Sequence, residues 1–217
     1  MQVIGKSVDL KESLRDKKVN LLIKRLFDMV ASFLGVVILS PIFIIVSICI
    51  KIDSKGPVFF KQKRVGKDGQ PFMIYKFRTM VTDAEKLGKQ ITVGDDNRIT
   101  KVGKFIRKCK LDEIPQLINV LKGEMSLVGP RPEVPRYAEL YDDYQAQVLL
   151  VRPGITDYAS IEYRNENEIL GKSANPEEIY ITEIMPTKID LNMKYLKNIS
   201  LTEDFKLIIK TILAVIK

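Results

Sequence analysis

The chain has 217 residues, of which 46% are hydrophobic and 29% charged, with a net charge of +8 and no histidine. This composition is typical of a folded protein of about one domain. The lack of histidine excludes His-based acid–base catalysis, Cys–His nucleophile pairs and the common zinc sites. The positive charge predicts an anionic partner, such as nucleic acid, phospholipid or a phosphorylated substrate. Two cysteines far apart in the sequence favour a reducing, cytoplasmic setting over a disulfide framework.

Residues 1–23 are polar and predict a lead-in with a short helix. An uncharged run follows from Met29 to Ile50, long enough for a straight helix to cross a bilayer, but Ser40 and Pro41 lie at its middle. The proline is expected to break the helix and leave two halves of about 14–17 Å, each too short to cross alone. The run follows a long charged segment and lacks a small-residue cleavage site, so we do not expect a cleaved signal peptide.

Lysine and arginine residues flank both ends of this run. A spanning segment tends to keep such residues on the cytoplasmic side only, whereas a hairpin that enters and leaves by one face would place both clusters in the cytosol. We therefore predict a re-entrant membrane helix over residues 24–51, with Ser40 and Pro41 as its hinge. A proline-kinked single span is the alternative, because membrane helices tolerate proline.

Residues 52–199 are predicted to form one cytosolic catalytic domain. Two β-prone runs within residues 56–80 flank a turn at Gly66–Gly69 and predict a hairpin. A later helix is expected to begin near Asp112 and to end at Gly123. The other expected elements are a short helix at 81–90, a loop at 91–100, a helix from 102, a proline-rich loop up to 133, helix over 134–150 and partly extended chain over 151–165.

Residues 200–217 predict an amphipathic helix. Ser200 and Glu203 fit a capping box. The pattern fits a helix in the lipid headgroup region and a helix packed on the domain equally well. The predicted fold class is therefore α+β and mostly helical, with a re-entrant membrane helix, a small β-hairpin or sheet and interfacial amphipathic helices. The apolar residues at helical spacing are Phe205, Ile208, Ile209, Ile212, Leu213 and Ile216.

The adjacent carboxylates Asp112 and Glu113 stand at the expected start of a helix. The positive end of the helix dipole there favours ionised carboxylates. An ionised Asp can act as a nucleophile, and its neighbour can hold a hard cation such as Mg²⁺. Ordinary helix capping is the alternative, and for such a pair on its own it is the commoner role.

Several cations accompany these carboxylates in the sequence. A phosphoanhydride substrate would need them, since carboxylate and phosphate otherwise repel each other. For each cation taken singly, a solvated basic surface is the alternative. The chain has no G-x-x-x-x-G-K-[ST] and no G-x-G-x-x-G, which argues against P-loop and Rossmann nucleotide sites. The cations are Lys76, Arg78, Arg107, Arg131, Arg152 and Arg164.

In these motifs the chain resembles the bacterial sugar transferases, the monotopic polyprenyl-phosphate phosphoglycosyl transferases. The likeness covers nearly the whole chain. The sequence elements that carry it are highly specific for this family when taken together, although no single element is. These elements are KRLFD, the Ser40–Pro41 break, GPVFFKQKRVGKDGQPFMIYKFRTM, RITKVGKFIRKCKLDEIPQLINVLKGEMSLVGPRPE and RPGIT.

The resemblance implies an enzyme that moves a sugar-1-phosphate from a UDP-sugar to undecaprenyl phosphate and releases UMP. Asp112 would form a covalent aspartyl phospho-sugar intermediate, and Glu113 would bind Mg²⁺. Such enzymes act at the cytoplasmic face of the bacterial inner membrane, in the first membrane step of surface glycan or exopolysaccharide synthesis, and a re-entrant helix broken at Ser-Pro holds them there. By motif position, the residues that would contact phosphate or nucleotide are Lys76, Arg107, Arg131 and Arg164.

The stretch from Asp157 to Asn165 departs from the Gly-Trp-Ala-Gln pattern of many relatives. This departure leaves the donor sugar and the role of Arg164 open. A second hypothesis is a non-catalytic membrane-docked scaffold whose basic face binds anionic lipid. A nucleic-acid-binding module is disfavoured, because the long apolar run has no place in it.

Overall fold

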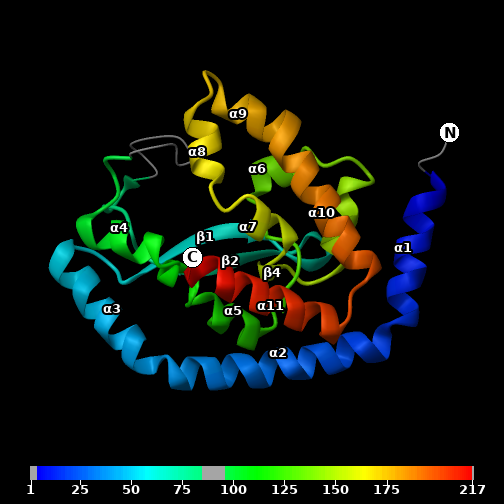
Figure 1. The fold of residues 1–217 in the computed structure, drawn as a ribbon, viewed down its shortest axis with the longest axis horizontal. Helices are drawn as coiled ribbons and strands as arrows, with labels where there is room; N and C mark the ends of the chain where they lie inside the picture. Colours follow the sequence, from blue (N-terminus) through cyan, green and yellow to red (C-terminus); the bar gives the residue numbers. More distant parts are fainter. Residues whose placement is uncertain (1–3, 85–95, 217) are drawn as a thin grey trace.

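The computed structural model describes residues 4–84 and 96–216. They form a mostly helical α+β protein, as predicted, in which short helices and two small sheets lie on one side of a long bent helix pair (Figure 1). The short helix expected at 81–90 and the loop expected at 91–100 fall largely outside the described residues.

The elements follow one another in two groups. The N-terminal group contains α1 (Ile4–Asp16), α2 (Lys18–Ile38), α3 (Ser40–Asp53), β1 (Phe59–Val65), the turn η1 (Lys67–Gly69), β2 (Pro71–Phe77), α4 (Lys101–Lys108), the single 3-10 turn η3 (Leu111–Glu113), α5 (Gln116–Lys122) and β3 (Ser126–Val128). The C-terminal group contains α6 (Pro135–Ala138), the 3-10 segment η4 (Gln145–Leu150), β4 (Gly154–Thr156), α7 (Tyr158–Glu162), α8 (Glu166–Gly171), α9 (Pro176–Ile179), the π-helical turn η5 (Tyr180–Ile184), α10 (Met185–Lys197) and α11 (Leu201–Ile216).

The predicted helix break lies at Leu39, directly before Ser40 and Pro41, while α2 begins well before the uncharged run. By helical rise, α2 is about 32 Å long and α3 about 21 Å. Among the residues that the structure describes, no single helix is both long and apolar enough to cross a membrane, whereas α2 and α3 together would be, and they are bent by 59°. Such a pair fits a broken span as well as a re-entrant loop, so the re-entrant topology stays a prediction.

The Ser-Pro pair accounts for the break in atomic detail. Pro41 lacks the N–H that would donate to the carbonyl of Val37 four residues earlier. Ser40 Oγ donates to this same carbonyl at 2.8 Å. The serine therefore satisfies the acceptor that the proline leaves, which matters in apolar surroundings, where an unpaired carbonyl is costly.

Both helices of the bent pair carry a large exposed apolar surface, as expected of a segment that contacts lipid or a partner. The exposed residues include Leu22, Leu26, Val30, Phe33, Leu34, Val37 and Ile38 on α2 and Ile42, Ile44, Ile45, Ile48 and Ile52 on α3.

Helix α2 is attached to the domain by the polar residues of the KRLFD motif. Lys24 Nζ donates to Asp204 Oδ2 on α11 at 2.6 Å. Asp28 Oδ2 accepts a hydrogen bond from Ser126 Oγ on β3 at 2.6 Å, and Arg25 donates to backbone carbonyls in the last turn of α5. The motif therefore joins the bent pair to the rest of the domain.

The predicted hairpin is confirmed, because β1 and β2 pair antiparallel with Phe59 opposite Phe77. The second sheet pairs β3 with β4 in parallel. Asn119 on α5 completes the edge of β2: its Oδ1 accepts from the Tyr75 backbone N at 2.9 Å, and its Nδ2 donates to the Met73 carbonyl at 2.8 Å. Helix α5 is thereby fixed to the strand that carries Lys76.

The predicted helix start near Asp112 is wrong. Asp112 lies in the turn η3, and α5 begins only at Gln116. The chain is redirected at Lys110, whose φ of 54° is left-handed and interrupts any helical continuation from α4. The predicted end at Gly123 is confirmed, with the left-handed φ of 88° that glycine adopts without strain.

The continuous helix expected over 134–150 is also wrong, because only α6 and η4 form there. Asp142 Oδ1 accepts from the Gln145 backbone N at 2.7 Å, a local turn that competes with helix. The extended chain expected within 151–165 is confirmed at β4, which is followed by α7.

Helix α11 packs on the domain with one face, where Asp204 and Leu207 are fully buried. The opposite, apolar face remains open, with Ile209, Ile212 and Leu213 all exposed. The capping interaction is partial: Ser200 Oγ accepts from the Glu203 backbone N at 3.3 Å, while the Glu203 carboxylate accepts from other side chains. The apolar spacing in the sequence therefore describes an exposed face more than a core face.

Candidate active site

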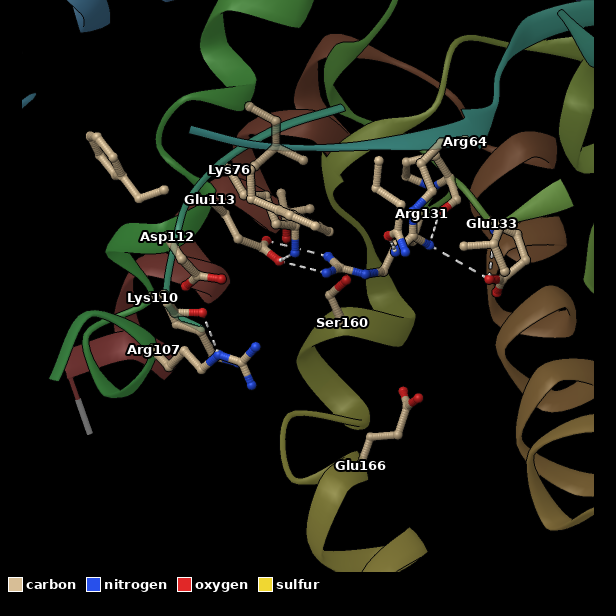
Figure 2. Close-up of a pocket in the computed structure, with 18 of the residues that line it drawn as sticks. Arg64, Lys76, Arg107, Lys110, Asp112, Glu113, Arg131, Glu133, Ser160 and Glu166 are labelled. Carbon is tan, nitrogen blue, oxygen red and sulfur yellow. Dashed lines mark hydrogen bonds and ion pairs between the residues drawn. The ribbon is translucent and has the colours of Figure 1, made fainter. Parts of the chain in front are cut away.

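A cavity of about 1460 Å³ opens between the hairpin, the α4–η3 segment, the loop at 130–133 and helices α7 and α10. The predicted residues Lys76, Arg107, Arg131 and the dyad Asp112–Glu113 all line it, and Figure 2 shows them converging from separate elements. The tertiary fold thus gathers residues that lie up to 55 positions apart in the sequence, the separation of Lys76 and Arg131.

Glu113 is the centre of an ion cluster (Figure 2). Lys76 Nζ donates to Glu113 Oε1 at 2.7 Å. Arg131 Nη2 donates to the same oxygen at 2.5 Å, and its Nη1 donates to Oε2 at 3.3 Å. A forked guanidinium contact of this kind fixes the carboxylate in orientation as well as in charge.

The electrostatics of this cluster favour an ionised Glu113 and an ionised Arg131. Burial alone would raise the pKa of Glu113, but Arg131 and then Lys76 outweigh it and hold that pKa well below its usual value. Glu113 in turn raises the pKa of Arg131. Burial lowers the pKa of Lys76, with Glu113 opposing the shift. The site therefore holds two basic side chains against one carboxylate.

Asp112 lies beside this cluster but differs from its neighbour. Within residues 4–84 and 96–216, no hydrogen bond or ion pair holds its carboxylate. Burial raises the pKa of Asp112, the charge of Lys76 lowers it and the charge of Glu113 raises it again. Two adjacent carboxylates thus have opposite pKa shifts, an arrangement that assigns different chemical roles to two similar groups.

Arg107 reaches the cavity from the last turn of α4. Its Nε donates to Thr79 Oγ1 at 2.8 Å, which orients the guanidinium. Burial lowers the pKa of Arg107, and the charge of Asp112 opposes that shift. Arg107 is therefore placed at the same cavity as the dyad without being bound to it.

The loop that carries Arg131 is held by Asp157, which belongs to the stretch from Asp157 to Asn165 that differs from the pattern of many relatives. The backbone N of Arg131 donates to Asp157 Oδ2 at 3.2 Å, and the other oxygen of Asp157 caps α7 by accepting from the Ser160 backbone N at 2.6 Å. Arg164, in contrast, is exposed at the cavity rim, and the structure does not bring it into contact with Asp112. Sequence reasoning missed Asp157, although its N-cap pattern before α7 was visible.

A second charged group at the cavity was also missed. Arg64 Nη1 donates to the Pro132 carbonyl at 3.0 Å and lies 3.6 Å from Glu133 Oε1. Tyr180 donates to the other oxygen of Glu133. Burial lowers the pKa of Arg64, with Glu133 opposing the shift. The signal was the position of Glu133, at the end of the proline-rich loop.

Two of the cations noted in the sequence are used elsewhere. Arg78 lines the cavity but donates to the backbone carbonyls of Ser54 and Lys55, at 2.8 and 2.5 Å. Arg152 Nε donates to the Gly123 carbonyl at 2.8 Å, beyond the end of α5. Backbone carbonyls therefore bind both guanidinium groups, and neither contacts Glu113.

The dyad offers carboxylate oxygens, the kind of ligand that Mg²⁺ prefers, and Mg²⁺ binding stays a prediction. In the described part of the chain, no three or more Asp, Glu, His or Cys side chains gather into a metal site. Mg²⁺ is commonly bound by one or two carboxylates together with substrate phosphates. Asp112, and the lone pairs left on Glu113 Oε2, supply that number of protein oxygens.

Comparison with known proteins decides the family. The family model for bacterial sugar transferases matches residues 19–217.

The chain belongs to the bacterial sugar transferase family.

Three relatives illustrate the range of the family. A protein of Aeromonas hydrophila named UDP-N-acetylgalactosamine-undecaprenyl-phosphate N-acetylgalactosaminephosphotransferase is 39% identical over 193 residues, covering 88% of this chain and 43% of its own length. A Klebsiella pneumoniae protein named UDP-glucose:undecaprenyl-phosphate glucose-1-phosphate transferase is 39% identical over 199 residues, covering 89% and 40%. The exopolysaccharide production protein ExoY of Sinorhizobium fredii is 34% identical over 207 residues, covering 88% and 84%.

This member of the family therefore spans about two fifths of the length of the first two relatives and most of the length of the third. The two relatives whose names give a donor differ in the sugar, which is N-acetylgalactosamine in one and glucose in the other.

Proposed function

We propose that this family member is a membrane-bound phosphoglycosyl transferase that moves a sugar-1-phosphate from a UDP-sugar to undecaprenyl phosphate and releases UMP. The observation that carries the proposal is the arrangement of Asp112 beside the Lys76–Glu113–Arg131 cluster. The cations suit a diphosphate, and the carboxylate of Asp112 has no side-chain partner among the described residues that would compete with a substrate. The names of the relatives support the same reaction.

In the first step, a carboxylate oxygen of Asp112 attacks the phosphorus that bears the sugar. The bond from this phosphorus to the bridging oxygen breaks, and UMP leaves with the electron pair, so the enzyme carries an aspartyl phospho-sugar. In the second step, a phosphate oxygen of the acceptor attacks the same phosphorus and the Asp112 carboxylate leaves. The product is a polyprenyl diphosphate sugar, and no water is consumed.

The cations of the cavity stabilise the charge that moves during these steps. Lys76 and Arg131 are held in place by Glu113 before the donor binds, so they need little reorganisation in the transition state. Arg107, oriented by Thr79, would contact the donor from the other side, and Arg164 would contact it at the rim. Glu113 would hold a Mg²⁺ ion, which when bound neutralises charge on the diphosphate.

The bent pair would place this site at the membrane surface. We propose that α2 and α3 enter the cytoplasmic leaflet of the bacterial inner membrane and return to the same side, with anionic lipids contacting the flanking lysines. The exposed apolar face of α11, which lies beside α2 where the rings of Phe27 and Phe205 are 4.9 Å apart, would contact the same leaflet. The reaction would be the first membrane step of surface glycan or exopolysaccharide synthesis.

The test is UMP release by purified protein in nanodiscs that contain undecaprenyl phosphate. UDP-glucose and UDP-N-acetylgalactosamine, with Mg²⁺, are the first donors to compare. We expect UMP with at least one UDP-sugar, and a loss of at least about a thousandfold in Asp112→Asn, because the nucleophile is removed. Full turnover in Asp112→Asn would contradict the proposed role, and no UMP with any UDP-sugar, together with retained vesicle binding, would favour the membrane-docked scaffold.

A further inference from the structure

The end of α3 is clamped to the end of β2 by a buried arginine. Arg78 Nη2 donates to the Ser54 carbonyl at 2.8 Å, and its Nη1 donates to the Lys55 carbonyl at 2.5 Å. Gly56 allows this approach, since a Cβ there would lie 2.3 Å from Arg78 Nη1 and the backbone φ of +126° suits glycine. The chain that leaves the bent pair is therefore bound to the strand that carries Lys76.

A separate contact ties α3 to α4. Asp53, the last residue of α3, accepts from the backbone N of Val102 through Oδ2 at 3.0 Å. Val102 lies in the first turn of α4, where backbone N–H groups have no partner inside the helix and a carboxylate is favoured by the dipole. Thr82 Oγ1 adds a third contact, to the Lys55 carbonyl at 2.9 Å.

Apolar packing completes this joint. Val46 and Ile50 on α3 are buried against Phe77 at the end of β2 and Ile106 on α4. All four side chains are at most 7% exposed, so this is a packed contact that apolar burial stabilises. The three elements α3, β2 and α4 therefore meet as one unit.

The joint continues into the active site through Thr79, the residue after Arg78. Thr79 Oγ1 accepts from Arg107 Nε, and its carbonyl accepts from the backbone N of Thr100 at 3.0 Å. Gly103 on α4 packs so closely that a Cβ there would lie 2.1 Å from the same carbonyl. The last residue of α3 therefore contacts directly the helix that leads to Asp112.

We propose that Asp53 and Arg78 are positioning residues that fix Asp112 at a set height above the bent membrane pair. This inference rests on the proposed function. The donor is water-soluble and reaches the cavity wherever the domain stands, whereas the acceptor phosphate is confined to the headgroup plane. Loosening the joint should therefore spare formation of the aspartyl phospho-sugar and impair its transfer, the step in which the acceptor oxygen displaces the Asp112 carboxylate.

The experiment measures the two steps separately on full-length protein in nanodiscs. The first step is measured without acceptor, as the rate at which labelled UMP is incorporated into the UDP-sugar. The second step is measured with acceptor, as the rate at which label on the sugar appears in undecaprenyl diphosphate sugar. The donor is the one that gives UMP with the wild-type protein. Asp53→Ala removes the contact to α4, Asp53→Asn keeps an acceptor oxygen, and Glu139→Ala removes an exposed carboxylate elsewhere.

We expect Asp53→Ala to keep UMP exchange within threefold of wild type and to lose transfer at least tenfold. Asp53→Asn and Glu139→Ala should keep both rates within threefold. Arg78→Met should behave as Asp53→Ala does, and Thr82→Val is a milder probe of the same joint if Arg78→Met does not fold.

Equal losses of exchange and transfer in Asp53→Ala, or no loss of either, would overturn the inference while leaving the proposed function intact. A wild-type protein that gives neither exchange nor transfer with any UDP-sugar would instead overturn the proposed function, and this inference with it.

Discussion

Replacing Lys76 with Met removes one of the two cations that Glu113 holds. Lys76 Nζ lies 2.7 Å from Glu113 Oε1, and the two side chains are only 18% and 19% exposed. Met has a similar length and no charge, so the change removes the ammonium and little volume. Lys63→Met, on an exposed position of the same hairpin, is the matched control.

The expected cost follows from the loss of one charged contact with the donor diphosphate. Such a hydrogen bond contributes about 1.5–3 kcal/mol, and about 1.4 kcal/mol corresponds to a factor of ten, so kcat/KM for the UDP-sugar should fall about 10- to 150-fold. Lys76→Arg should lose less, because the positive charge remains.

The charge of Lys76 also determines how the rate of UMP release depends on pH. Asp112 reacts as a carboxylate, and the charge of Lys76 is the largest influence that lowers its pKa against burial. Without Lys76 that pKa rises, so activity should be lost at a higher pH on acidification. Burial also lowers the pKa of Lys76, so any loss of rate on the alkaline side that comes from its deprotonation should disappear in the variant.

The assay is the initial rate of UMP release across pH 5–9 at subsaturating donor. A kcat/KM within threefold of wild type throughout, or an acid limb that moves to lower pH, would refute this assignment of Lys76. A loss of the same size in Lys63→Met would show that the effect is not local to the site.

Three further outcomes are expected. Glu113→Gln should raise the Mg²⁺ concentration for half-maximal UMP release about tenfold, because one anionic ligand is lost, and an unchanged Mg²⁺ dependence would contradict the metal role. Ser40→Ala combined with Pro41→Leu should straighten the bent pair and lower transfer; one-sided accessibility of cysteines introduced near residues 20 and 55 would show that something else sets the bend. Asp204→Ala removes the 2.6 Å partner of the buried Lys24, which keeps only Asp28 at 3.7 Å, and should destabilise the fold by about 1.5–3 kcal/mol. Denaturant unfolding in detergent measures this change, and a value below about 0.5 kcal/mol would speak against the buried pair.

Features governed by neighbouring residues could be predicted from the sequence. The hairpin follows from the glycine-flanked turn, the end of α5 from Gly123 and the helix break from Ser40 and Pro41. The start of α5 could not be placed, because the left-handed backbone at Lys110 belongs to a residue with no strong preference for it. Local rules therefore located the elements and misplaced the dyad within them.

The partners of the dyad depend on contacts between distant segments. The sequence named six cations, and the family resemblance selected Lys76, Arg107, Arg131 and Arg164 by motif position. Arg78 is two residues from Lys76, yet its guanidinium binds the backbone at the end of α3, a role that only the path of the chain determines. Asp157 was seen only as a departure from the family pattern, whereas in the fold it supports Arg131.

The measurement that tests the central claim most directly is the mass of the protein after mixing with the UDP-sugar and Mg²⁺ in the absence of acceptor, followed by digestion to locate the modification. The account predicts an added sugar-phosphate mass on the peptide that contains Asp112. This mass should disappear on addition of UMP or undecaprenyl phosphate and be absent in Asp112→Asn. Modification of another residue, or transfer to the lipid with no modified protein under any quench, would contradict Asp112 as the nucleophile.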